Sequence, residues 1–346
     1  MKFKRALCFD DVLLVPQKSR ILSRDMIDIS SSIREHKFRL PVISSPMDTV
    51  TEADMAIAMQ ACGGLGIIHR YNTIEEQAKI VSEVVDFLEE INSENISKIS
   101  AAIGVGDDFM TRATALYDAG ARIICIDVAH GHHSLVEMAL KSLKDKYGKS
   151  VSLIAGNVAT PEGYIDLSEW GADAVRLGIG GGSICSTRIQ TGHGVPTLQT
   201  VLECRSVDAN SKIIADGGIK TTGDIVKALA AGADFVMLGS MLAGTSETPG
   251  TTLKGNSGEQ YKVYRGMASP EAQIAWKGSA RSLEGISTTV PYKGYATDVL
   301  DETSRNIKSG LSYSGALDLS ELRAKAEFIR QSSSGLDESR THILRR

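Results

Sequence analysis

Short apolar runs alternate with longer stretches of helical spacing along the first 240 residues of the chain. The runs are apolar on both faces, which is typical of strands in a parallel sheet that helices cover on both sides. Each run ends in small or polar residues before the next helical stretch begins. We expect strands in eight segments: 42–48, 65–70, 100–105, 122–131, 153–158, 174–177, 213–218 and 235–240.

The segments between these runs carry helix signals. Residues 51–62 are rich in Ala and Met, and Thr73 is followed three residues later by Glu76, which is the spacing of a capping box. Eight strand-then-helix units predict a closed (β/α)8 TIM barrel, with an open doubly wound sheet as the alternative. We therefore expect α/β class and a single catalytic domain over residues 1–346.

The chain changes character after the eighth unit. Residues 247–262 are polar, and residues 276–293 are rich in Gly, Ser and Thr. This composition predicts a mobile flap at about residues 268–292, lying over one end of the barrel. A helix is expected at 319–329, followed by a polar, weakly ordered tail at about residues 332–346.

Composition excludes several classes of function. The 346 residues carry a formal net charge of −4, which gives no general attraction to nucleic acid or to an anionic membrane. No apolar run is long enough to span a membrane, and the N-terminal residues do not resemble a signal peptide. The five cysteines are scattered without a Cys-x-x-Cys pair, which indicates free thiols in a reducing compartment. We expect a cytoplasmic protein.

The glycine-rich loop at residues 178–188 is the strongest candidate for chemistry. Its glycines let the backbone approach a ligand closely with its N–H groups turned inward, and Ser183 adds a hydroxyl suited to phosphate. Cys185 follows, where oriented amides and Arg188 would favour the thiolate, and Thr187 is close enough to relay a proton. The alternative is a flexible loop with an ordinary buried cysteine.

Polar residues at the carboxyl ends of barrel strands gather at one rim and usually serve function. Those predicted here are Ser45, Asp48, His69, Asp127, Asn157, Cys185, Asp216 and Ser240. The glycines after the seventh and eighth strands predict a phosphate-binding site, with ordinary tight turns as the alternative. Asp216 is suited to bind the ribose hydroxyls. In the flap, Glu284 could bind the amide edge of a purine or act as a general base, or be an ordinary solvated glutamate.

Seven ordered motifs resemble the IMP dehydrogenase/GMP reductase family, over about residues 6–330. They are Cys8–Pro16, Ser45–Val50, Ala155–Val158, Gly182–Cys185, Ala215–Gly218, Tyr264–Met267 and Val290–Gly294. The resemblance implies a (β/α)8 barrel, a purine nucleoside 5′-monophosphate as substrate, a nicotinamide cofactor and a homotetramer.

The resemblance also implies a role for individual residues. Cys185 would attack C2 of the purine to form a covalent adduct, and Thr187 with Glu284 would transfer protons. Substrate contacts would come from Ser45, Ser183, Asp216, Gly218, Gly239, Ser240, Tyr264, Gly266, Met267, Arg281 and Glu284. The nicotinamide would face Asp127, Val128, Ala129, Asn157 and Gly178, and a monovalent cation such as K⁺ would bind at Gly180, Gly182 and Cys185.

Two features favour the reductase branch, which reduces GMP to IMP and ammonia with NADPH. Only about 30 residues separate His69 from Ser100, so the regulatory domains that dehydrogenases typically insert there are absent. The spacing Arg281-x-x-Glu284-Gly285 matches reductases, and Ser282 stands where dehydrogenases have the Tyr of an Arg-Tyr pair.

Other features are closer to dehydrogenases, namely Tyr264–Met267, Asp127–Gly131 and Gly335–Ser339. Reductases usually have Asn at the position of His130 and Lys at the position of Arg70. Gly181 and Ser186 differ from the residues that are common at these positions in both branches. The alternatives are therefore an NAD-dependent IMP dehydrogenase without the inserted domains and a non-catalytic purine-nucleotide-binding barrel.

Overall fold

Eight parallel strands close into a barrel in the computed structural model, which describes residues 3–280 and 284–341. Around the barrel the order is β10-β11-β4-β5-β6-β7-β8-β9, so neighbours in sequence are neighbours in space. The strands are β4 (Val42–Ser44), β5 (Leu65–Ile68), β6 (Ser100–Ile103), β7 (Ile123–Asp127), β8 (Ser152–Val158), β9 (Ala174–Leu177), β10 (Lys212–Asp216) and β11 (Phe235–Leu238). The predicted (β/α)8 barrel is confirmed.

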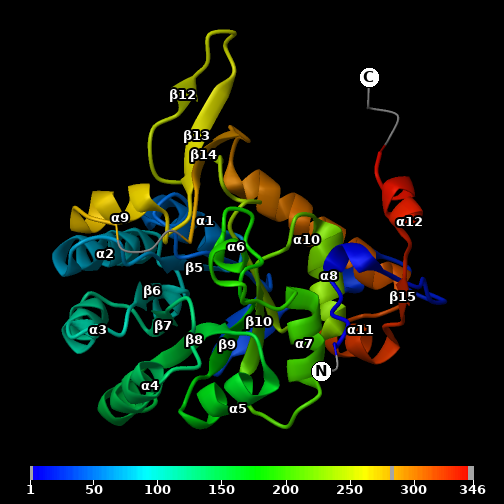
Figure 1. Cartoon of the computed structure of the whole chain (residues 1–346), viewed down its shortest axis with the longest axis horizontal. Helices are drawn as coiled ribbons and strands as arrows, with labels where there is room; N and C mark the ends of the chain where they lie inside the picture. The colour runs from blue at the N-terminus through cyan, green and yellow to red at the C-terminus, as the bar shows by residue number, and fades with distance from the viewer. Residues whose placement is uncertain (1–2, 281–283, 342–346) are drawn as a thin grey trace.

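Helices cover the outside of the barrel (Figure 1). They are α1 (Ala53–Ala61), α2 (Ile74–Glu90), α3 (Phe109–Asp118), α4 (Ser134–Tyr147), α5 (Pro161–Glu169), α7 (Thr197–Arg205), α8 (Thr222–Ala231) and α10 (Ala296–Tyr313). The predicted capping box begins α2: Thr73 Oγ1 accepts from Glu76 N at 3.1 Å, and Thr73 N donates to Glu76 Oε2 at 3.0 Å. Between β5 and β6 the described chain forms α2 and η3 (Ile96–Lys98), with no inserted domain.

A small hairpin closes the amino-terminal end of the barrel, and the sequence pattern did not predict it. Its strands are β2 (Ser31–Ile33) and β3 (His36–Phe38), preceded by η2 (Arg24–Met26). Ile33 and Phe38 are buried, and the Phe38 ring packs edge-on against Phe235 with centroids 5.7 Å apart. Apolar contact therefore fills this end and leaves the carboxyl-terminal end for a site.

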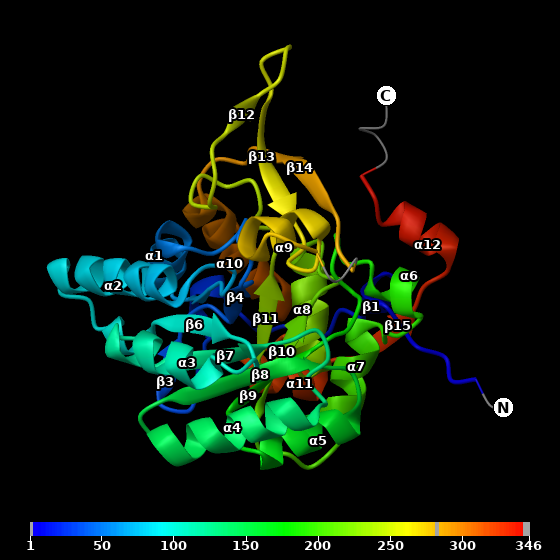
Figure 2. The same cartoon turned by 60° about the vertical axis from the view of Figure 1, so that its left-hand side comes forward.

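A three-stranded antiparallel sheet stands out from the carboxyl-terminal end (Figures 1 and 2). It contains β12 (Leu253–Lys254), β13 (Gln260–Arg265) and β14 (Ser287–Pro291), and α9 (Pro270–Lys277) lies at its base. The segment predicted as a flap thus includes a helix and a strand. Strand β14 pairs with β13 in a register that sets Tyr264 opposite Thr288.

The first and the last strand of the described chain pair with each other beside the barrel. After η1 (Phe9–Asp11), β1 (Val12–Leu14) pairs antiparallel with β15 (Phe328–Arg330). The helix predicted at 319–329 is therefore too long: α11 (Leu319–Lys325) ends at Lys325, and from Ala326 the backbone is extended and leads into β15. The predicted polar tail begins with α12 (Ser333–Glu338). No helix in the described part of the chain is long and apolar enough to cross a membrane.

The capping box at α2 gives a test of local stability. Thr73→Ala removes the side-chain acceptor for the Glu76 N–H, and loss of such a cap costs about 0.5–2 kcal/mol. We expect the midpoint of urea unfolding, followed by circular dichroism, to fall for this variant. Thr252→Ala, at an exposed position outside any helix, is the matched control and should leave the midpoint unchanged. Equal midpoints for the two variants would contradict the capping role.

Candidate active site

A cavity of about 470 Å³ opens at the carboxyl ends of the barrel strands. Most of the predicted site residues line it; Arg281 lies outside the described residues, and Asp48 and His69 line a neighbouring cavity. The lining contains Ser45, Asp127, Val128, Ala129, Asn157, Gly178, Gly180, Gly182, Ser183, Cys185, Thr187, Asp216, Gly218, Gly239, Ser240, Tyr264, Gly266, Met267 and Glu284. Segments far apart in sequence therefore meet at one cavity.

A chain of hydrogen bonds connects the candidate nucleophile to a carboxylate. The Cys185 thiol donates to Thr187 Oγ1 at 3.2 Å, and the Thr187 hydroxyl donates to Glu284 Oε2 at 2.8 Å. Both hydrogen bonds point the same way, so a proton can pass from the Cys185 sulfur through the Thr187 hydroxyl to the carboxylate of Glu284. Such an arrangement can generate a thiolate and can return a proton to a leaving group.

Backbone pairing positions Glu284 beside the cysteine loop. Cys185 and Gly285 form an antiparallel bridge, Ser186 N donates to Glu284 O at 3.0 Å, and Ile286 N donates to Ile184 O at 3.1 Å. Gly285 is required there, because a Cβ would come within 2.9 Å of Ser269 N. The cysteine loop and the flap segment therefore form one hydrogen-bonded unit.

The cysteine loop approaches its neighbours too closely for side chains. A Cβ on Gly178, whose φ is +139°, would lie 2.1 Å from the carbonyl oxygen of Asp216. The loop leads into α6 (Thr187–Thr191), and Arg188 of this helix donates to the carbonyl of Val195 at 2.8 Å. The same guanidinium also donates to the carbonyl of Ile179 at 3.3 Å, which joins the two ends of the loop.

Neutral donors converge at one end of the cavity. Ser183 Oγ lies 3.5 Å from Tyr264 OH, and a Cβ on Gly239 would come within 2.9 Å of the same hydroxyl. Burial raises the pKa of Tyr264 despite its hydrogen bond to Ser183, so the phenol keeps its proton at neutral pH. Gly217 and Gly218, with φ of +87° and +79°, pass beside Gly181 and Gly182. Hydroxyls and close glycine backbone are suited to a phosphate group.

A buried arginine that the sequence analysis did not assign to the site lies under the cavity. Arg176 of β9 forms ion pairs with Asp127 at 2.5 Å and with Asp216 at 2.9 Å. Burial alone would raise the pKa of Asp127, but Arg176 and Arg70 outweigh it and lower that pKa. The sequence signal that could have identified Arg176 is that it is a single charged residue in the apolar run 174–177.

Asn157 joins the same network from β8. Its side-chain amide donates to Asp216 Oδ2 at 2.8 Å and to Gly178 O at 2.9 Å. These two bonds link the Asp216 carboxylate to the start of the cysteine loop. Asp127, Asp216 and Asn157 are therefore held in fixed positions before any ligand binds.

Arg70 connects this network to the flap. Its Nε lies 3.5 Å from Asp127 Oδ2, and its guanidinium lies over the rings of Tyr71, at 5.2 Å, and Trp276, at 5.7 Å. The two rings are themselves in contact, with centroids 4.3 Å apart. Helix α9 is thereby held next to the Asp127 side of the cavity.

Two predicted rim residues face a neighbouring cavity instead. Asp48 pairs with Arg265, and His69 Nε2 lies 2.9 Å from Glu52 Oε1; both residues line a separate cavity of about 470 Å³ under α9. Both residues follow the carboxyl ends of their strands, as expected, but they do not line the main cavity, because each is turned toward its hydrogen-bond partner.

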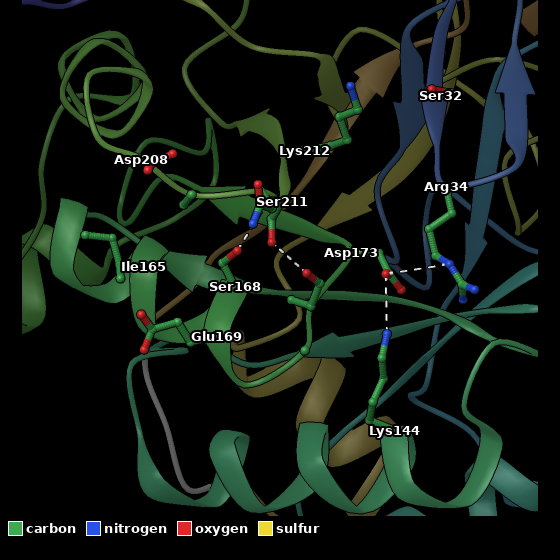
Figure 3. Close-up of a pocket in the computed structure, with 14 residues that line it drawn as sticks. Ser32, Arg34, Lys144, Ile165, Ser168, Glu169, Asp173, Asp208, Ser211 and Lys212 are labelled. Carbon is green, nitrogen blue, oxygen red and sulfur yellow. Dashed lines mark hydrogen bonds and ion pairs between the residues drawn. The ribbon is translucent and has the colours of Figure 1, made fainter.

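A third cavity, of about 510 Å³, lies at the amino-terminal ends of the strands (Figure 3). Its charges neutralise one another: Asp173 lies 3.5 Å from Lys144 and 3.8 Å from Arg34. That end of a (β/α)8 barrel serves stability rather than chemistry, so we place the active site at the other end.

The cysteines differ in environment. Burial raises the pKa of Cys125 and Cys204 to about 12 and that of Cys62 to about 11. Cys185 is partly exposed at the cavity, and Cys8 is exposed. Cys125 and Cys204 are therefore closed to a reagent, and the raised pKa of the partly exposed Cys62 leaves it little thiolate at neutral pH.

The chain is similar to known proteins along nearly its whole length. The inosine-5′-monophosphate dehydrogenase of Nitrosopumilus maritimus is 34% identical over 473 aligned positions, covering 99% of both chains. That of Borreliella burgdorferi is 36% identical over 394 positions, covering 98% of this chain and 97% of the relative. Both alignments exceed the 346 residues of this chain, so these relatives contain segments that it lacks.

A solved structure is also similar along nearly the whole chain. The GMP reductase from Trypanosoma brucei in complex with guanosine 5′-monophosphate superposes with a TM-score of 0.91 at 30% identity, covering 98% of each chain. The family model described as the IMP dehydrogenase / GMP reductase domain matches residues 6–342. The chain therefore belongs to the IMP dehydrogenase/GMP reductase family of oxidoreductases.

Proposed function

We propose that the protein is a GMP reductase, which converts GMP to IMP and ammonia with NADPH as the hydride donor. The observation that carries the proposal is the hydrogen-bond chain Cys185–Thr187–Glu284 at the edge of a nucleotide-sized cavity. The similar structure from Trypanosoma brucei is a GMP reductase that holds guanosine 5′-monophosphate, which supports the choice of substrate.

The cavity has a suitable partner for each part of GMP. The phosphate would meet Ser183, Gly218, Gly239, Ser240 and the hydroxyl of Tyr264, and the ribose hydroxyls would meet Asp216. Ser45, Gly266, Met267 and Glu284 line the remainder, where the purine would lie. In this placement C2 of the base would face Cys185.

The proposed chemistry begins with the thiol. Its proton passes through Thr187 to Glu284, the sulfur forms a bond to C2, and the C2–N2 bond breaks as ammonia leaves with a returned proton. A bound nicotinamide would supply hydride to C2, whereupon the C2–S bond breaks to give IMP and a Cys185 thiolate, which takes up one proton from solvent to restore the thiol. Glu284 thus first accepts and then donates a proton.

The Asp127 side of the cavity fits a nicotinamide cofactor, which supplies the hydride when bound. Asp127, Val128, Ala129, Asn157 and Gly178 line this side and would hold the ring. Arg176 fixes Asp127, so the carboxylate can orient a polar group without moving. No group of three or more His, Cys, Asp and Glu side chains suited to a metal ion occurs in the described chain.

The short flap favours reductase over dehydrogenase. A dehydrogenase must activate water to hydrolyse its covalent intermediate, whereas a reductase releases ammonia and needs no such step. Between α9 and β14 there are only nine residues, 278–286, of which three lie outside the described residues. Arg281 falls among these three, so its substrate contact stays a prediction.

An IMP dehydrogenase without inserted domains is the second candidate. The curated relatives at 34% and 36% identity are named as inosine-5′-monophosphate dehydrogenases, and they favour this reading. The homotetramer, the cytoplasmic location and the monovalent cation at Gly180, Gly182 and Cys185 stay predictions under either function.

Loss of the carboxylate relay tests the proposal. With GMP and NADPH, followed by absorbance at 340 nm, Glu284→Gln should lower kcat by about 10² or more, because general acid–base help is lost. The KM for GMP should change less, since the phosphate contacts stay. Glu271→Gln, on the exposed first turn of α9, is the control and should match the unmutated protein.

Two results would count against the proposal. One is a Glu284→Gln variant as active as the Glu271→Gln control. The other is an unmutated protein that forms NADH steadily from IMP and NAD but oxidises no NADPH with GMP, which would assign the dehydrogenase instead.

Selective alkylation tests the nucleophile. At pH 8, a pKa of about 12 leaves about one thiol in 10⁴ ionised, so Cys125 and Cys204 should resist iodoacetamide. We expect peptide mapping to show inactivation in step with modification of Cys185, and GMP to slow both. Cys8→Ser should remain active and be inactivated at the same rate. Inactivation that follows a different cysteine would overturn the assignment.

A further inference from the structure

The loop after β11 forms a single tight turn beside the proposed phosphate end of the cavity. Leu242 N and Ala243 N donate to the carbonyl of Gly239, at 3.1 and 2.8 Å. The carbonyls of Ser240 and Met241 receive the ammonium of Lys293, at 2.7 and 3.3 Å. The side chain of Lys293, just beyond β14, thus binds the turn that we predict to bind phosphate.

The main chain fixes Lys293 in place as well. Lys293 N donates to the carbonyl of Gly244 at 2.9 Å, and Ser246 N donates to the carbonyl of Gly294 at 2.8 Å. A Cβ on Gly244 would come within 2.4 Å of the Pro291 carbonyl oxygen, so the two segments are in close contact. The position of the ammonium therefore follows from the backbone on both sides of it.

The charge of Lys293 is not compensated. Lys293 is partly exposed to solvent, no carboxylate in the described part of the chain forms an ion pair with it, and partial burial lowers its pKa. Lys220, which lines the same end of the cavity, differs because it pairs with Asp10 at 2.8 Å. Arg176 is likewise neutralised by Asp127 and Asp216.

A phosphate dianion needs this charge. Ser183 and Tyr264 contribute neutral hydroxyls, and the glycine turns contribute neutral amides. Because a trans peptide is planar, the Met241 N–H points opposite to the Ser240 carbonyl that Lys293 binds. An ammonium on that carbonyl polarises the peptide and strengthens its N–H as a donor.

We propose that Lys293 is a positioning residue for the substrate phosphate: it fixes the Gly239–Met241 turn and supplies positive charge from behind it. The inference rests on the proposed function, because it assumes a nucleoside monophosphate in the cavity. It predicts that Lys293 affects binding through the phosphate and not through the base.

The test compares GMP with guanosine in binding titrations of Lys293→Met, Lys293→Arg and the unmutated protein. Lys293→Met should weaken GMP binding by about tenfold to hundredfold, the range expected when a hydrogen-bonded charge is removed. Guanosine binding, or its competition with GMP where direct binding is too weak to follow, should change less than about threefold. Lys293→Arg should restore most of the GMP affinity, since it keeps the charge.

A control and the contrary outcomes complete the test. Lys254→Met removes an exposed lysine from β12 of the same sheet and should leave both affinities unchanged. Equal weakening of GMP and guanosine by Lys293→Met would mean that the residue only supports the fold, and unchanged GMP binding would also overturn the inference. If the unmutated protein fails to bind GMP, the proposed function fails first, and the two failures are thereby distinguished.

Discussion

The buried guanidinium of Arg176 is the constraint on which the site depends. A charge under the floor of the cavity is stable only with carboxylates in contact, and Asp127 and Asp216 provide them from β7 and β10. Both carboxylates are therefore held rigidly, one toward the proposed nicotinamide and one toward the proposed ribose. Asn157 extends the network to Gly178, so the first residue of the cysteine loop is tied to the same centre.

The reactive groups are assembled by a second, weaker unit on top of this floor. The cysteine loop and the flap segment share backbone hydrogen bonds, and these bring Glu284 to Thr187 although the two are far apart in sequence. Few buried apolar side chains support this unit. The structure thus combines the rigid ion-pair network of Arg176, which suits ligand binding, with the less firmly packed Cys185–Glu284 unit. The second unit suits entry of substrate and release of ammonia.

The sequence predicted the barrel and most of the site because both depend on local pattern. Apolar runs marked the eight strands, and residues at their carboxyl ends had to share one rim. Pairing between distant segments was not predictable in the same way: Phe328 and Ile329 read as helix, yet they pair with β1. Asp48 and His69 were expected at the rim, but the sequence did not show that their partners Arg265 and Glu52 turn them away from the main cavity. The role of Arg176 became clear only when two carboxylates from other strands stood beside it.

The covalent step is the central claim, and mass spectrometry of the intact protein tests it most directly. In the reverse direction, IMP loses hydride from C2 to NADP⁺ as the Cys185 thiolate bonds to that carbon. Without ammonia a reductase has no means to release this adduct. The account predicts a single burst of NADPH and an added nucleotide mass on the peptide that contains Cys185. Continuous cofactor reduction without an adduct, or an adduct on another residue, would contradict it.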